Sequence, residues 1–123
     1  MNILLTDDDR EILESLRRCL SARGHQVRTA SSGQEALVRM EESPPDLVIS
    51  DIQMPRMDGL AFLKAAQERF PEVPVVLMTG NRQGGAEAAA LCGGARGYLE
   101  KPIRVERLLA CIAEIEASGH TQP

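Results

Sequence analysis

The sequence has no tryptophan, and its only aromatic residues are one tyrosine and two phenylalanines. Proteins that bind single-stranded nucleic acids stack the bases on aromatic side chains, so this scarcity argues against such a platform. The chain is not basic either, because 14 Lys and Arg stand against 18 Asp and Glu, a net charge of −4. Nucleic-acid-binding domains carry a positively charged face instead. We therefore expect no direct binding of nucleic acid by this chain.

Long apolar runs and cysteine pairs are missing as well. No stretch approaches the ~20 apolar residues of a membrane-spanning helix, and the start MNILLTDDDR lacks the basic and apolar regions of a signal peptide. Cys19, Cys92 and Cys111 are widely spaced and form no C-x-x-C motif. Neither a zinc site nor a disulfide framework is indicated. These absences favour a cytoplasmic protein with reduced cysteines and no membrane association.

What the sequence does contain is a regular alternation of two patterns. Short apolar or alternating stretches predict strands at 2–6, 25–30, 46–50, 74–79 and 96–100. Apolar residues at helical spacing predict helices from Ile12 to the stop at Gly24, from a cap at Ser31 or Ser32 to Pro44, at Gly59–Phe70, at 83–92 and from about Arg104 to Glu116. Gly84 and Gly85 weaken the fourth of these helices, each by ~1 kcal/mol relative to Ala.

The same spacing indicates which side chains of the helices face inward. These are Ile12, Leu13, Leu16, Cys19 and Leu20, then Ala36, Leu37 and Met40, then Leu60, Leu63, Ala66 and Phe70, and finally Val105, Leu108, Leu109, Ile112 and Ile115. Five strands that alternate with helices predict an α/β domain with a parallel sheet covered on both faces. The most polar strand, 25–30, should form an edge. We therefore predict a doubly wound, flavodoxin-like (βα)5 fold with strand order 2-1-3-4-5.

Chemically useful residues follow four of the five predicted strands. The first strand ends at Asp7 and Asp8, the third at Asp51 and the fourth at Thr79, and the fifth leads into Lys101. Ligands of such sheets bind beyond the carboxyl ends of the strands. Two carboxylates 4 Å apart repel by roughly 4 kcal/mol at an effective dielectric near 20, so the acids must share protons or hold a cation. Mg²⁺, which prefers carboxylates, water and phosphate, fits this site.

Each of these residues also has a simpler interpretation. Asp7–Asp9 could cap the first helix, because acids favour helix N-termini. Thr79 could be an ordinary strand-end residue, Lys101 a surface lysine, and Tyr98 a residue that packs at the sheet edge. For Asp9 we expect only a capping or solvated role. The convergence of four strand ends favours a phosphoryl-binding site for the others, with an aspartate as a nucleophile.

Four stretches carry a family resemblance: LLTDDD, DLVISDIQMPRMDG, VVLMTG and GYLEKP. In this order and spacing they resemble the receiver domains of bacterial response regulators, the chemotaxis-regulator-like proteins of two-component signalling. The resemblance covers residues 1–117, which leaves 118–123 as a polar tail or the start of a linker. It implies that Asp51 is the phosphoacceptor. It also implies Mg²⁺ binding by Asp8, Asp51 and the backbone carbonyl of Gln53, with Asp7 reaching the ion through water.

The resemblance further implies a switch. Lys101 would pair with the phosphoryl group, the Thr79 hydroxyl would bind it in the active state, and Tyr98 would change rotamer with Thr79. The Lys101–Pro102 bond would be cis. Two positions would tune the lifetime of the phosphate, Gln53 and Asn81. Thr6 departs from the family pattern, which has an aliphatic residue before the acidic pair.

The function that this resemblance implies is a phosphorylation-activated switch. A sensor histidine kinase would load Asp51, and an output domain or partner protein would read the changed face of the fourth helix, fifth strand and fifth helix. The resemblance is also compatible with a homodimer of the phosphorylated protein. We expect no enzymatic activity beyond phosphorylation of Asp51 and slow autodephosphorylation.

Two other functions use a similar arrangement of residues. A Mg²⁺-dependent phosphohydrolase with an Asp nucleophile uses a similar sheet. Such enzymes usually carry a second Asp two residues after the first, where this chain has Gln53, and a cap domain that this sequence does not show. A degenerate receiver that only docks a partner would lack an acid, the Thr or the Lys, and all are present.

Overall fold

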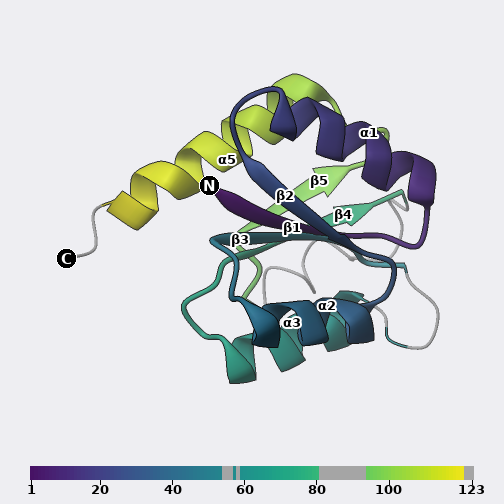
Figure 1. Cartoon of the computed structure of the whole chain (residues 1–123), viewed down its shortest axis with the longest axis vertical. Coiled ribbons are helices and arrows are strands. Elements are labelled where there is room, and N and C mark those ends of the chain that lie inside the picture. Colours follow the sequence, from purple (N-terminus) through teal and green to yellow (C-terminus); the bar gives the residue numbers. More distant parts are fainter. Residues whose placement is uncertain (54–56, 58, 81–93, 121–123) are drawn as a thin grey trace.

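The computed structural model describes residues 1–53, 57, 59–80 and 94–120. These residues form a five-stranded sheet flanked by helices (Figure 1). The elements are β1 (Asn2–Thr6), α1 (Arg10–Ser21), β2 (Gln26–Ala30), α2 (Gly33–Glu42), β3 (Leu47–Asp51), α3 (Gly59–Arg69), β4 (Val75–Thr79), β5 (Gly97–Glu100) and α5 (Val105–His120). The predicted fourth helix at 83–92 lies outside the described residues, as do Pro55, Asn81 and Cys92.

All neighbouring strands are parallel, in the order β2-β1-β3-β4-β5. The predicted topology is therefore confirmed, with β2 at one edge. β3 and β4 are buried along their whole length, whereas the first four residues of β2 are exposed or half-buried. Because β1, β3 and β4 are adjacent and parallel, their carboxyl ends lie side by side at the same end of the strands.

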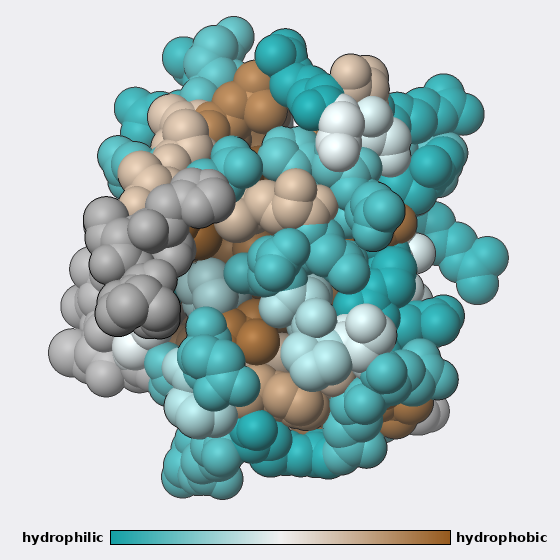
Figure 2. Space-filling view, turned by 60° about the vertical axis from the view of Figure 1, so that its left-hand side comes forward, coloured by the Kyte–Doolittle hydropathy of each residue, from teal (hydrophilic) through white to brown (hydrophobic). Residues whose placement is uncertain are grey.

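Helices cover both faces of the sheet (Figure 1). The sheet therefore separates two apolar cores. On one face α2 and α3 cover a core that includes Leu4 and Val48, which we call the α2/α3 core. On the other face α1 and α5 cover a core that includes Leu5 and Ile49, the α1/α5 core. This assignment follows from the alternation of side chains along a strand. The face seen in Figure 2 is mostly hydrophilic, with apolar atoms confined to small areas between polar side chains.

The helix starts are fixed by side-chain caps. The carboxylate of Asp9 accepts hydrogen bonds from the backbone N–H groups of Glu11 and Ile12, which confirms its expected capping role in α1. Of the two candidate caps of α2, Ser32 is the N-cap, and its hydroxyl accepts from the N–H of Glu35. Such caps satisfy N–H groups that have no partner within the helix.

Three local expectations need correction. The helical spacing predicts that Val105 faces inward, but it is 41% exposed, because the helix first reaches the core one turn later at Leu108. α5 continues to His120 rather than ending near Glu116. In α3 the fully buried aromatic side chain is Phe62, which the apolar spacing did not indicate, whereas Leu60 is only partly buried.

Two of the three cysteines belong to the described residues. Cys19 and Cys111 are free cysteines and half-buried. No helix among these residues combines the length and the apolar character needed to cross a membrane.

Candidate functional site

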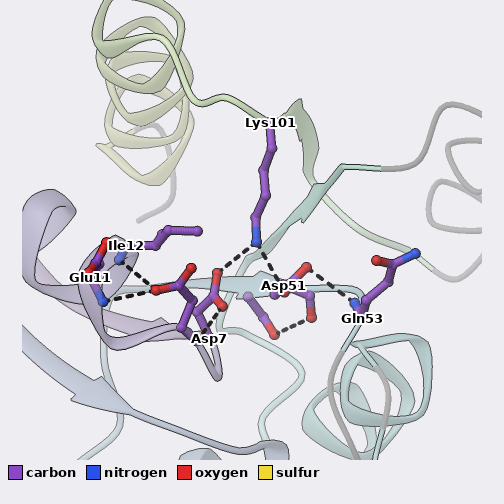
Figure 3. A network of polar contacts seen from close by, with 8 residues as sticks. Asp7, Glu11, Ile12, Asp51, Gln53 and Lys101 are labelled. Carbon is purple, nitrogen blue, oxygen red and sulfur yellow. Dashed lines mark hydrogen bonds and ion pairs between the residues drawn. The ribbon is translucent and has the colours of Figure 1, made fainter.

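Asp7, Asp51 and Lys101 lie together beyond the carboxyl ends of the strands (Figure 3). Asp7 follows β1 directly, and Asp51 and Thr79 are the last residues of β3 and β4. Lys101 follows β5, and its side chain extends toward the two acids. The sequence prediction that these four strand ends converge is therefore correct for Asp7, Asp51 and Lys101.

Lys101 bridges the two buried acids of the site. Its Nζ lies 2.9 Å from Oδ2 of Asp7 and 3.1 Å from Oδ2 of Asp51. Asp7 is fully buried and Asp51 is 4% exposed. A carboxylate at such depth needs a partner charge and hydrogen bonds to remain ionised, and Lys101 supplies the charge.

Backbone N–H groups hold the remaining carboxylate oxygens. The N–H of Gln53 donates to Oδ1 of Asp51 at 3.2 Å, and the N–H of Asp9 donates to Oδ1 of Asp7 at 2.9 Å. Each acid therefore has one oxygen fixed by the backbone and the other fixed by Lys101. This arrangement orients both side chains before any ligand arrives.

A third carboxylate completes the cluster. Asp8 is exposed, and the ligand atoms of Asp7, Asp8 and Asp51 lie within 4.8 Å of one another. Three carboxylates and one ammonium group leave a net charge of −2, which matches a divalent cation. All ligand atoms are oxygens, the donors that Mg²⁺ prefers. The residues present therefore fit the magnesium ion that was expected from the sequence.

The pKa values of the buried groups reflect these environments. Burial, which disfavours the charged carboxylate, raises the pKa of Asp7 despite the hydrogen bonds from Asp9 and Lys101. For Lys101, burial disfavours the ammonium form. Its hydrogen bonds to Asp7 and Asp51 outweigh that effect and raise the pKa of Lys101. The lysine is therefore a stable positive charge at neutral pH.

Ser50 and Gly59 both lie against the backbone of Asp51, and the sequence indicated a structural role near the site for Gly59 but did not single out Ser50. The hydroxyl of Ser50 donates to the carbonyl oxygen of Asp51 at 3.1 Å. A Cβ atom on Gly59 would lie 2.5 Å from that same carbonyl oxygen, so α3 can begin here only with glycine. The role of Gly59 is thus close approach, because its φ does not lie in the left-handed region. A serine within an otherwise apolar strand was the available signal for Ser50.

Thr79 and Tyr98 occupy the neighbouring positions on β4 and β5. Thr79 is 1% exposed, and its carbonyl oxygen accepts from the backbone N–H of Lys101 at 2.6 Å. Tyr98 is half-buried and packs against the α2/α3 core. The Lys101–Pro102 peptide bond is cis, as expected. Asn81, the second predicted lifetime-tuning position, lies outside the described residues.

Sequence comparison connects this site to known proteins. The profile of the response regulator receiver domain matches residues 3–113. The response regulator MprA of Mycobacterium leprae is 40% identical over 112 residues, which are 91% of this chain and 49% of that protein. MprA of Mycobacterium bovis is 39% identical over 110 residues, 89% of this chain and 48% of that protein. The chain thus spans about half the length of these curated relatives.

Solved structures agree. A response regulator receiver domain protein from Clostridium thermocellum superposes with a TM-score of 0.90 at 31% identity, over 98% of this chain and 97% of that one. The receiver domain of NtrX from Brucella abortus gives a TM-score of 0.85 at 35% identity, over 92% and 96%. The family profile, the relatives and the acidic cluster at the sheet edge lead to one conclusion: this chain belongs to the family of response-regulator receiver domains, the phosphorylation-dependent switches of two-component signalling.

Proposed function

We propose that Asp51 accepts a phosphoryl group from the phosphohistidine of a sensor histidine kinase, in a reaction that requires Mg²⁺. The observation that carries this proposal is the position of Asp51, at a strand end between Lys101 and two further carboxylates. A carboxylate oxygen of Asp51 forms the new bond to phosphorus. The phosphorus–nitrogen bond breaks at the same centre, and its electron pair leaves with the imidazole.

The residues around Asp51 have distinct tasks in this step. Asp8, Asp51 and the Gln53 carbonyl would hold the metal ion, and Asp7 would reach it through water. When bound, the ion would neutralise charge on the incoming phosphoryl oxygens. The backbone N–H of Gln53 keeps the Asp51 side chain oriented. Lys101, released from its contact with Asp51, pairs with a phosphoryl oxygen. Its raised pKa keeps it charged for this task.

The change of charge at Asp51 then acts on Thr79 and Tyr98. The Thr79 hydroxyl binds the phosphoryl group, and Tyr98 changes rotamer and alters the output face, which we expect to consist of β5, α5 and the helix predicted from the sequence at 83–92. A cavity of about 450 Å³ on this side is lined by Tyr98, Leu99, Glu100, Lys101, Pro102, Arg104 and Arg107. It offers a partner or an output domain access to both the switch residue Tyr98 and the site lysine Lys101.

Gln53 and Asn81 set the lifetime of the phosphate on Asp51. A homodimer of two phosphorylated copies is one form that the output can take.

Incubation with acetyl phosphate, followed by intact-mass measurement, tests the proposal. The wild type should gain one phosphate in Mg²⁺ and none in EDTA. Asp51→Asn should gain none, and Asp8→Asn should require more Mg²⁺. Asp9→Asn is the matched control, because this acid caps α1 and does not belong to the metal cluster. Phosphate on Asp51→Asn at an unchanged level contradicts the assignment.

The same experiment separates the alternatives. Continuous release of inorganic phosphate at many turnovers per minute indicates a phosphohydrolase, whereas no labelling of the wild type indicates a docking module. One labile phosphate per chain, lost slowly, indicates the switch.

A further inference from the structure

Thr6, the last residue of β1, carries a buried polar group that the proposed reaction does not use. Its side chain is fully enclosed, and its Oγ1 has no hydrogen-bond partner among the described residues. A buried hydroxyl without a partner is unfavourable, because it has lost its hydrogen bonds to water. Valine, with the same branched shape, avoids this loss. We therefore expect the hydroxyl of Thr6 to have a hydrogen-bond partner.

Ser50 lies beside Thr6 in the sheet. The two residues are register partners on the parallel strands β1 and β3, and both are fully buried. Two residues earlier in each strand, Leu4 and Val48 belong to the α2/α3 core. Since side chains alternate between the faces of a sheet, Thr6 and Ser50 point to this same face. Neighbouring strands lie about 4.8 Å apart, a spacing at which one shared water can bridge the two hydroxyls.

The hydrogen-bonding capacities of the two hydroxyls are complementary. A hydroxyl has one donor and two acceptor positions. The donor of Ser50 is used, because its Oγ donates to the carbonyl oxygen of Asp51 at 3.1 Å, but its acceptor positions remain. We propose that the Thr6 hydroxyl donates to Ser50 through one buried water, and that Thr6 and Ser50 together are positioning residues for the acidic site.

This inference rests on the proposed function, and its physical reason lies in the neighbouring residues. Thr6 directly precedes Asp7, and Ser50 directly precedes Asp51. Like charges on the two acids push the strand ends apart. A hydrogen-bonded link immediately behind the acids opposes this repulsion. It keeps the ligand oxygens at the spacing that one metal ion requires.

The test measures Mg²⁺ affinity from the amide NMR shift of Gln53, whose N–H donates to Asp51. Thr6→Val should weaken Mg²⁺ binding about fivefold, the factor that corresponds to a hydrogen bond of about 1 kcal/mol. Thr6→Ser retains the hydroxyl and should restore the affinity. Ser50→Ala should weaken binding to a similar extent, and adding Thr6→Val to it should cause no further loss. Such coupling is not expected of two independent structural substitutions.

Thr29→Val is the matched control. It removes a hydroxyl from the adjacent strand β2, but Thr29 is register partner of Leu5 and lies on the other face of the sheet. Its Mg²⁺ affinity should equal that of the wild type. Wild-type affinity in Thr6→Val, or losses in the two single variants that simply add, overturns this inference alone. A wild type whose Gln53 amide shows no response to Mg²⁺ overturns the proposed function and this inference together.

Discussion

The ammonium group of Lys101 lies between Asp7 and Asp51, 2.9 Å and 3.1 Å from their Oδ2 atoms. The ammonium group therefore neutralises part of the negative charge that attracts a divalent ion. Two cations near the same carboxylates repel each other, which reduces the affinity of the site for the ion.

Lys101→Met should consequently bind Mg²⁺ at least tenfold more tightly than the wild type. The metal-free variant should be less stable in urea, because Asp7 and Asp51 lose their partner charge. Titration followed by NMR and urea unfolding measure the two effects. Lys64, an exposed lysine on α3, provides the control as Lys64→Met and should change neither quantity. Unchanged Mg²⁺ affinity in Lys101→Met shows that the lysine and the ion do not compete.

Thr79→Ala should leave the phosphorylation of Asp51 intact and reduce the response of Tyr98 to it. The substitution leaves Asp51 and its contacts with Lys101 and Gln53 in place, so labelling by acetyl phosphate should stay within about twofold of the wild type. The change of the Tyr98 ring signals on phosphorylation should be strongly reduced, because no hydroxyl binds the phosphoryl group. Thr79→Ser keeps the hydroxyl and should retain the change. An undiminished Tyr98 response in Thr79→Ala contradicts the switch.

Gly94 and Gly24 allow a comparison of two backbone positions with nearly equal positive φ, 94° and 91°. Nothing lies within 4 Å of a Cβ on Gly24, so Gly24→Ala should cost only the backbone strain, about 1–2 kcal/mol. A Cβ on Gly94 would contact the Gln67 side chain, whose Nε2 donates to the Gly94 carbonyl at 2.9 Å. Gly94→Ala should therefore cost about 1 kcal/mol more.

In a Gln67→Ala background this extra cost should disappear, leaving Gly94→Ala equal to Gly24→Ala in urea unfolding. Equal costs in the wild-type background show instead that the Gln67 hydrogen bond contributes nothing to the stability of this turn.

Glu14 on α1 gives a prediction for pH. Hydrogen bonds from Arg17 and then Arg18 lower the pKa of Glu14 to about 2, from 4.5. Because the folded pKa is lowered, the stabilisation is present above pH 4.5 and is lost as the pH falls through about 2. Glu14 lies at the surface, so added salt should screen its attraction to Arg17 and Arg18 and raise its pKa. Carboxyl NMR titration should show a larger rise of the pKa in Arg17→Met than in Arg18→Met.

The amino-acid sequence by itself determined the order of the described elements and which residues gather at the ends of the strands. Strand periodicity and helix caps depend on residues close in the chain, so Asp51 could be placed at a strand end and Asp9 at a helix start. The polar character of 25–30 was sufficient to predict that β2 is an edge strand. The motifs around Asp7, Asp51, Thr79 and Lys101 pointed to a phosphoryl site because acids, a hydroxyl and a lysine followed separate strands.

Only the tertiary structure decided how these groups meet. The contact of Lys101 with both acids joins residues from three strands, and no local pattern encodes such a distance. The apolar residues of α3 lie on several sides of the helix, so their spacing alone does not indicate which side faces the core. In the folded protein Phe62 is fully buried, whereas Leu60 is not. Thr6 and Ser50 become neighbours only through the register of β1 with β3. Contacts between residues far apart in the chain depend on which strands pair and in which register, and the packing of the whole core selects that arrangement.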